Sequence, residues 1–296
     1  MKNFIKENNS IIYFALTLAY AVLIYCNTSY LNPIDEMSIP EAYKYNRWYG
    51  IEPWQFENGR FHVLNGLDIF VLKKYFFLNS VHFYYLVCAF QFILTAVVFY
   101  KLLKVLNKFQ PEIFLYFYLL LFCPGFTTIY FRLLYPEKVV LLISILIVYW
   151  LIQIFYLNKM KVRYFILIAV LANVCMYFKE SAFCLFFTLG IGLLIINYKN
   201  KNKSNYIFFL GTVMIISSLI YIIVYSYFVT PKINIRYGYN DVSFCKNFIL
   251  SFVAWIINDP IIMLLFIPIV LRNVYSLIKN KLDGFSVIDV FGIAGI

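Results

Sequence analysis

Charged residues are scarce in this sequence: Asp, Glu, Lys and Arg make up 13% of its 296 residues, against about 25% in ordinary soluble domains. Acids are rarer still, with 14 in the whole chain. Hydrophobic residues reach 63%, and apolar runs of about 20 residues, the length of one helical membrane span, recur along the chain. The composition therefore excludes a soluble globular domain and predicts an all-α polytopic membrane protein.

Cysteine and histidine patterns that form disulfide frameworks or bind zinc are also missing. The six cysteines include no C-x-x-C pair and lie mostly in apolar runs, where cysteine acts as a small buried hydrophobe. Two isolated histidines, His62 and His82, are too few for a histidine-based zinc site. The net charge of +11 does not indicate nucleic-acid binding, because the bases lie in short segments between apolar runs.

The apolar runs predict about eight to nine transmembrane helices in a single transmembrane domain, residues 1–296. The predicted spans are 11–30, 81–100, 112–129 with a bend at Pro124-Gly125, 139–157, 164–178, 182–198, 206–229, and 248–271 with a break at Asp259-Pro260. A ninth run begins at Phe285 and stops at the last residue, so we expect a chain truncated within a ninth span. No internal repeat is visible, which disfavours a transporter built from inverted repeats.

Lysine and arginine predict the orientation. Fourteen of the 25 fall in the N-terminus and in segments 101–110, 158–163, 199–205 and 272–284. By the positive-inside rule these segments are cytoplasmic. The first apolar run is long and no small-residue cleavage site follows it, which favours a retained helix over a signal peptide. Heavy use of Lys, Asn, Ile, Phe and Tyr suggests an AT-rich bacterial genome. We therefore expect a multi-pass protein of the bacterial inner (cytoplasmic) membrane with its N-terminus in the cytoplasm.

The longest external loop is the first, residues 31–80. Its sequence "RWYGIEPWQFENGRFHVLNGLDIFVLKKYFF" is rich in aromatic residues, which favour the membrane interface and indicate packed structure. Within it, residues 67–76 have the pattern of an amphipathic helix lying along the bilayer. The loop is therefore predicted to carry juxtamembrane helices rather than to be disordered.

Acids and bases collect on that same predicted outer side. They are Asp35 and Glu36 after the first span, Glu57, Arg60 and His62 in the long loop, Arg132, Glu137 and Lys138 between two spans, and Lys179 and Glu180 in "YFKESAF". Ionisable groups this close to hydrocarbon are usually paired or functional. Each also has a structural interpretation, as a solvated helix cap, a snorkelling turn or an interfacial ion pair.

Four features together resemble the GT-C superfamily of membrane glycosyltransferases. They are the acidic pair after the first span, the long outer loop with interfacial helices, the "NGRF" segment, and "FKES" between two later spans. The nearest branch is the bacterial one that includes the aminoarabinose and protein-mannosyl transferases. Members are commonly longer, with more spans and often a C-terminal outer domain.

The resemblance implies transfer of a sugar from a polyprenyl-phosphate-linked donor to a glycan, lipid or protein acceptor on the outer face. It implies that Asp35 is the catalytic base and Glu36 its partner. Lys179 resembles a lysine that faces the donor phosphate, and Arg132 and Arg60 match phosphate-binding arginines more weakly. Glu137, Glu180 and His62 would support this site.

The chemistry is consistent with these roles. A positioned carboxylate takes the proton of a weakly nucleophilic hydroxyl, and fixed cations stabilise the leaving phosphate. The oxygens of Asp35 and Glu36 are also ligands of the kind that Mg²⁺ or Mn²⁺ takes, so a divalent cation is a candidate cofactor.

Three other classes remain open. An O-antigen-type polymerase or ligase uses similar donors, but its largest outer loop typically comes late in the chain. A lipid or solute transporter or flippase predicts charged residues deep in several spans, and Asp259 is the main example here. A scaffold without chemistry predicts that Asp35 and Lys179 tolerate substitution together.

Overall fold

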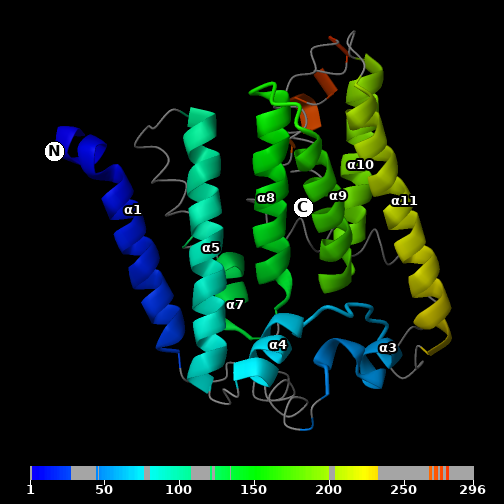
Figure 1. Ribbon diagram of the computed structural model, residues 1–296, viewed down its shortest axis with the longest axis horizontal. Helices are drawn as coiled ribbons and strands as arrows, with labels where there is room; N and C mark the ends of the chain where they lie inside the picture. Colours follow the sequence, from blue (N-terminus) through cyan, green and yellow to red (C-terminus); the bar gives the residue numbers. More distant parts are fainter. Residues whose placement is uncertain are drawn as a thin grey trace. The chain divides into compact units, whose positions relative to one another are not determined.

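The computed structural model describes residues 2–27, 45, 47–76, 81–107, 121, 124–133, 135–199 and 204–232, and isolated positions between 267 and 279. Within these residues the fold is all-helical and contains no strand, which confirms the predicted class (Figure 1). The long helices are α1 (Lys2–Tyr25), α5 (Val81–Asn107), α8 (Glu137–Phe155), α9 (Val162–Phe178), α10 (Ala182–Lys199) and α11 (Asn205–Phe228). The short ones are η1 (Tyr49–Ile51), α3 (Pro53–Glu57), α4 (Leu67–Phe76), α7 (Pro124–Phe131) and η2 (Thr230–Lys232).

Several helices have the length and composition of membrane spans. Among the described residues, three are long and apolar enough to cross a bilayer: His82–Val105, Glu137–Phe155 and Asn205–Lys232. Shorter apolar helices cover Ser10–Tyr25, Val162–Phe178 and Ala182–Tyr198. These helices indicate a membrane protein. The count of eight to nine spans stays a prediction, because the runs at 248–271 and from 285 onward lie largely outside the described residues.

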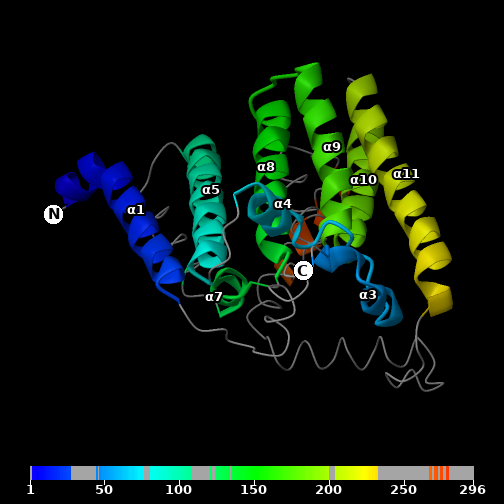
Figure 2. The ribbon, with the colours of Figure 1, turned by 60° about the horizontal axis from the view of Figure 1, so that its bottom comes forward.

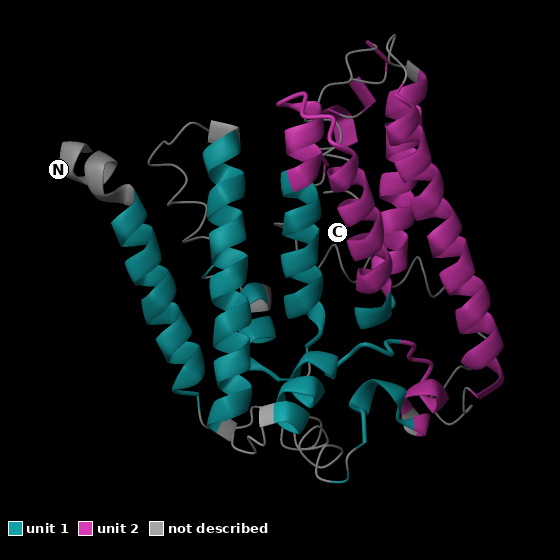
Figure 3. Cartoon of the chain, in the orientation of Figure 1, with its two compact units in different colours: residues 1–52, 62–149, 177–180 teal, residues 53–61, 150–176, 181–296 magenta. Residues whose placement is uncertain are grey.

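The chain divides into two compact units that interleave along the sequence (Figure 3). Unit 1 comprises residues 1–52, 62–149 and 177–180, and unit 2 comprises residues 53–61, 150–176 and 181–296. The prediction of a single domain stays a prediction.

The core of unit 1 is aromatic and joins α1, α5 and α7. Helix α1 runs beside α5 (Figures 1 and 2), and the Tyr13 hydroxyl donates a hydrogen bond of 2.7 Å to the Ala96 carbonyl. Phe92 on α5 packs edge-on against Tyr130 of α7, with ring centroids 5.3 Å apart. The Tyr130 hydroxyl is 2.8 Å from Thr95 Oγ1. Buried hydroxyls thus find partners across the helix pairs, as a low-dielectric interior requires.

Unit 2 is held together by a close contact between α10 and α11. A Cβ atom added to Gly190 would lie 2.9 Å from the Gly211 carbonyl oxygen, and one added to Gly211 would lie 3.0 Å from the Gly190 carbonyl oxygen. Small residues let membrane helices approach closely and gain van der Waals contact. The far side of α11 carries exposed apolar residues, including Phe209 at 63% and Ile223 at 67%. Such a face suits lipid rather than water.

The predicted loop 31–80 contains the expected short helices where it is described. In unit 1, α4 coincides with the amphipathic helix predicted at 67–76. The Trp48 ring stacks on Phe70 of α4, and its Nε1–H donates a hydrogen bond to the Asn65 carbonyl. Gly50 packs directly on the chain that precedes α4, since a Cβ there would lie 2.8 Å from the carbonyl oxygens of His62 and Val63. Residues 47–52 and 62–76 of the loop therefore pack on one another within unit 1, as the aromatic content of the loop predicts.

Candidate functional site

Two turns of unit 1 bring Lys179 and Glu137 together. Glu137 opens α8 directly after Pro136, where a carboxylate is favourable at the positive end of the helix dipole. Lys179 follows the last residue of α9, in the short turn that precedes α10. The Lys179 Nζ lies 3.0 Å from Glu137 Oε1. Both side chains are about one-third exposed, so the ion pair sits at the boundary of the packed interior.

Glu180, the next residue in that turn, accepts a hydrogen bond from His62. The His62 Nδ1 atom is 3.3 Å from Glu180 Oε2, and the imidazole is 3% exposed. Burial opposes ionisation of Glu180, but the His62 bond, a bond from its own backbone N–H and the charge of Lys179 together lower the pKa of the carboxyl to about 2. Because an ionised carboxylate only accepts hydrogen bonds, Nδ1 of His62 carries the proton.

Backbone hydrogen bonds around His62 fix the position of its imidazole. The Leu64 N–H donates a hydrogen bond of 2.9 Å to the carbonyl of Tyr177 at the end of α9. The Asn65 N–H bonds back to the His62 carbonyl at 2.8 Å, and Gly66 follows with a φ of 75°, a conformation that glycine adopts without strain. The sharp turn before α4 therefore holds the imidazole against the Lys179–Glu180 turn.

Lys138 and Arg132 occupy the segment that leads into α8. Lys138 is 3% exposed, and its ammonium donates to the carbonyl oxygens of Arg132 at 2.9 Å and Leu133 at 3.1 Å, and to Cys88 Sγ at 3.2 Å. The Arg132 guanidinium donates to the Tyr135 hydroxyl at 3.2 Å and lies over the same ring. These bonds fix the backbone of the segment that carries the Arg132 side chain.

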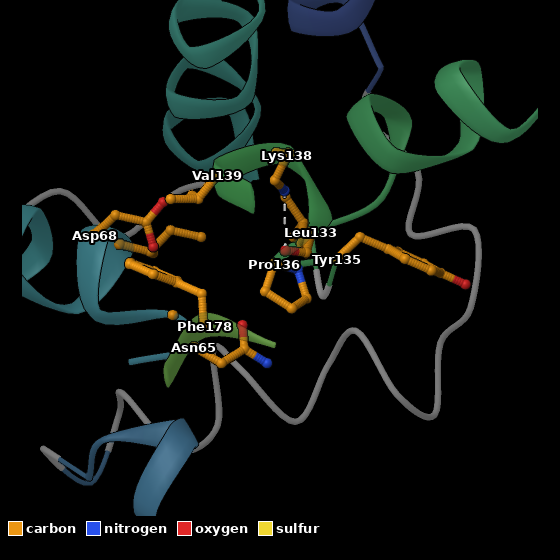
Figure 4. A pocket seen from close by; sticks show the side chains of 10 residues that line it. Asn65, Asp68, Leu133, Tyr135, Pro136, Lys138, Val139 and Phe178 are labelled. Carbon is orange, nitrogen blue, oxygen red and sulfur yellow. Dashed lines mark hydrogen bonds between the residues drawn. The ribbon is translucent and has the colours of Figure 1, made fainter. Parts of the chain in front are cut away.

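A small pocket of unit 1 lies beside these groups (Figure 4). Asn65 and Asp68 line it from the turn before α4 and from α4 itself, Pro136 and Lys138 from the start of α8, and Phe178 from the end of α9. The empty space, including the part open to solvent, is about 230 Å³. Gln91 of α5 donates a hydrogen bond to Asp68 Oδ2, which holds the carboxylate in place.

The structure brings together four of the predicted site residues, Glu137, Lys179, Glu180 and His62. Arg132 lies in the chain before α8, where its carbonyl accepts a hydrogen bond from Lys138. Arg60 belongs to unit 2, where its side chain is exposed and its backbone N–H bonds to the Gln55 carbonyl at 2.9 Å.

The predicted catalytic and metal residues Asp35 and Glu36 lie outside the described residues. The described part of the chain contains no group of three or more His, Cys, Asp or Glu side chains that would hold a metal. The divalent cation therefore stays a prediction.

Sequence reasoning assigned no role to Asn65, Asp68 and Gln91. A local signal for the first two does exist, because Asn65-Gly66 is a typical turn dipeptide and Asp68 falls in the first turn of the helix that follows. Gln91 gives no such signal, since a single glutamine in an apolar helix is ordinary.

No family model, curated protein or solved structure matches this chain. The function is therefore inferred from the residues themselves and from the chemistry that their geometry permits.

Proposed function

We propose that this protein is an integral-membrane glycosyltransferase that moves a sugar from a polyprenyl-phosphate-linked donor to an acceptor on the external face of the bacterial cytoplasmic membrane. The observation that carries the proposal is the Lys179–Glu137 ion pair. An ammonium has three N–H donors. Glu137 Oε1 takes one, and the other two have no partner among the described residues.

That ammonium suits a phosphate oxygen. Glu137 holds it at a fixed place near the ends of α8 and α9, where part of the solvent is excluded and an electrostatic contact is stronger than in bulk water. The Arg132 guanidinium, with one N–H bonded to Tyr135, keeps further donors for a second phosphate oxygen. The carboxylate of Glu180 adds a counter-charge that His62 orients.

In the proposed reaction the acceptor hydroxyl oxygen attacks the anomeric carbon of the donor sugar. The bond between that carbon and the phosphate oxygen breaks, and its electron pair stays on the phosphate beside Lys179 and Arg132. Asp35 takes the hydroxyl proton, and Glu36 supports it. A single displacement inverts the anomeric centre. The N-terminus then faces the cytoplasm and the Lys179–Glu180 turn faces outward.

The test is sugar transfer in membranes that contain the full-length protein. Radiolabelled polyprenyl-phosphate sugars are supplied, and label in the acceptor fraction is measured for wild type, Asp35→Asn and Lys179→Met. Both variants are expected to insert normally and to lose at least ~100-fold in rate, the scale of one general base or one electrostatic donor. The matched control is Lys161→Met, which changes an exposed lysine directly before the start of α9.

Unchanged transfer by Asp35→Asn would show that Asp35 is not the catalytic base. Unchanged transfer by Lys179→Met would show that Lys179 does not contact the donor phosphate. A polymerase or ligase would instead elongate or transfer a whole glycan, which the size of the labelled product reports.

A further inference from the structure

The predicted outer end of α11 carries two cations that the proposed reaction does not use. Arg60 follows the turn after α3, and Lys232 is the last residue of η2, the short helix after α11. Both side chains are exposed, and both residues belong to unit 2. Neither side chain forms an ion pair or a hydrogen bond with the residues that the structure describes. Their N–H donors are therefore available to a ligand at the surface.

Contacts within unit 2 bring the two cations to the same end of α11. The Tyr225 hydroxyl of α11 donates a hydrogen bond of 2.8 Å to the carbonyl of Gly59, the residue before Arg60. The Lys232 Nζ lies 5.1 Å from the centre of the Phe56 ring in α3. Figures 1 and 2 show α3 close to this end of α11. Arg60 and Lys232 therefore project from neighbouring turns.

This end of α11 has the composition of a membrane–water interface. The candidate span that contains α11 exposes apolar side chains along its length, and Ile223 is 67% exposed. Tyr227 and Phe228 follow, both exposed, with ring centroids 5.0 Å apart. Aromatic side chains of membrane helices gather at the level of the lipid headgroups. We therefore expect Arg60 and Lys232 to lie at the depth of the lipid phosphates.

A lipid phosphate matches these two cations chemically. A phosphodiester is anionic and only accepts hydrogen bonds, whereas both cations only donate them. Arginine binds phosphate oxygens in a bidentate manner, and lysine acts as a point charge. Glu57, also exposed in α3, offsets one of the two positive charges. An anionic headgroup therefore neutralises the remaining charge, and a zwitterionic headgroup does not.

We propose that Arg60 and Lys232 bind the phosphate of an anionic phospholipid in the outer leaflet, whose acyl chains lie along the exposed apolar face of α11. The ligand is a bulk membrane lipid rather than the lipid carrier of the sugar. Both cations are exposed, whereas a phosphate that leaves in a reaction is stabilised best where water is excluded. The lipid site does not depend on the proposed transferase activity.

Native mass spectrometry of the purified full-length protein in detergent tests the site. Phosphatidylglycerol and phosphatidylcholine with identical acyl chains are titrated, and the fraction of protein that retains each lipid is measured. Wild type is expected to bind the anionic lipid more tightly than the zwitterionic one. Arg60→Gln and Lys232→Met are each expected to weaken binding of the anionic lipid about fivefold, the scale of one basic residue beside an anionic surface.

Lys161→Met is the matched control, because it removes the same charge from an exposed lysine directly before α9. It is expected to bind phosphatidylglycerol as wild type does. All three variants are expected to keep the wild-type melting temperature in lipid-free detergent, since the substituted side chains are exposed. Equal binding of the two lipids by wild type, unchanged binding by both site variants, or an equal loss in Lys161→Met would each overturn the proposal.

Two further probes identify the source of the phosphate. Inorganic phosphate is expected not to displace phosphatidylglycerol, because it makes no apolar contact with α11. Polyprenyl phosphate is expected to bind the Arg60→Gln and Lys232→Met variants as tightly as wild type, because its proposed contact is Lys179. Displacement by inorganic phosphate would make this a site for free anions. Loss of polyprenyl phosphate from both variants would make it a site for the sugar carrier, and either result would overturn the proposal.

Discussion

Lys138 uses its whole hydrogen-bonding capacity inside the protein, so we expect its role to be positional. Lys138→Met keeps most of the side-chain volume but leaves the Arg132 and Leu133 carbonyls without their donor. We expect a loss of about 2 kcal/mol in stability, the scale of leaving buried polar groups unpaired. Thermal unfolding in detergent measures it, with Lys161→Met as the exposed control. An equal melting temperature in the two variants would contradict the role assigned to the buried ammonium.

We expect Glu180 to make the stability of the protein sensitive to acid. Its folded pKa of about 2 lies below the usual 4.5, so ionised Glu180 stabilises the fold fully above pH 4.5 and loses that contribution as pH falls toward 2. Glu180→Gln removes this contribution at every pH. The melting-temperature difference between wild type and Glu180→Gln should therefore shrink as the pH falls from 4.5 toward 2. A difference that grows on acidification would refute the assignment.

The sequence predicted which charges gather at this end of the helices but not how they pair. Lys179 and Glu137 are 42 positions apart, and His62 and Glu180 are 118 positions apart. Neither spacing carries a periodic signal, since the pairs form only when separate helices end at one place. Asn65 and Asp68 line one pocket with Lys138 only because the turn before α4 meets the start of α8.

At the scale of elements, the helices were the most predictable part. The run predicted at 206–229 is α11 (Asn205–Phe228), and the short amphipathic segment at 67–76 is α4. A long apolar run predicts a helix such as α11 because every backbone group in a bilayer must bond within its own segment. Helix α1 begins at Lys2, well before the predicted start at residue 11, because polar residues continue the helix outside the apolar run.

A substitution at Gly50 tests the close packing of this residue on the turn before α4. Gly50→Ala would place a methyl group 2.8 Å from two backbone oxygens and 3.0 Å from that of Asn65, none of which can rotate away. We expect a cost of about 2 kcal/mol, as for overpacking, because the 62–65 turn must shift. Thermal unfolding in detergent measures this cost, with Lys161→Met as the exposed control. A wild-type melting temperature would show that the close packing of Gly50 on the 62–65 turn does not contribute to stability.

At the scale of the whole molecule, the charge distribution predicts the orientation. Fourteen of 25 bases lie in segments predicted to be cytoplasmic, so the Lys179–Glu180 turn should face outward. Alkaline phosphatase fused after Ser181 is expected to be active, because it folds only outside the cytoplasm, and the same reporter fused after Met160 is expected to be inactive. The reverse pattern would place the site on the cytoplasmic face, where an externally acting transferase cannot work.

The most direct measurement is the consumption of synthetic polyprenyl-phosphate sugars by the purified full-length protein in liposomes. If the account is right, at least one sugar is released from its carrier in step with the appearance of free polyprenyl phosphate, and Lys179→Met slows this at least ~100-fold while Lys161→Met does not. If no donor is consumed by wild type across the panel in the presence of acceptor membranes and divalent cations, the ion pair at Lys179 has another purpose and the glycosyltransferase proposal is wrong.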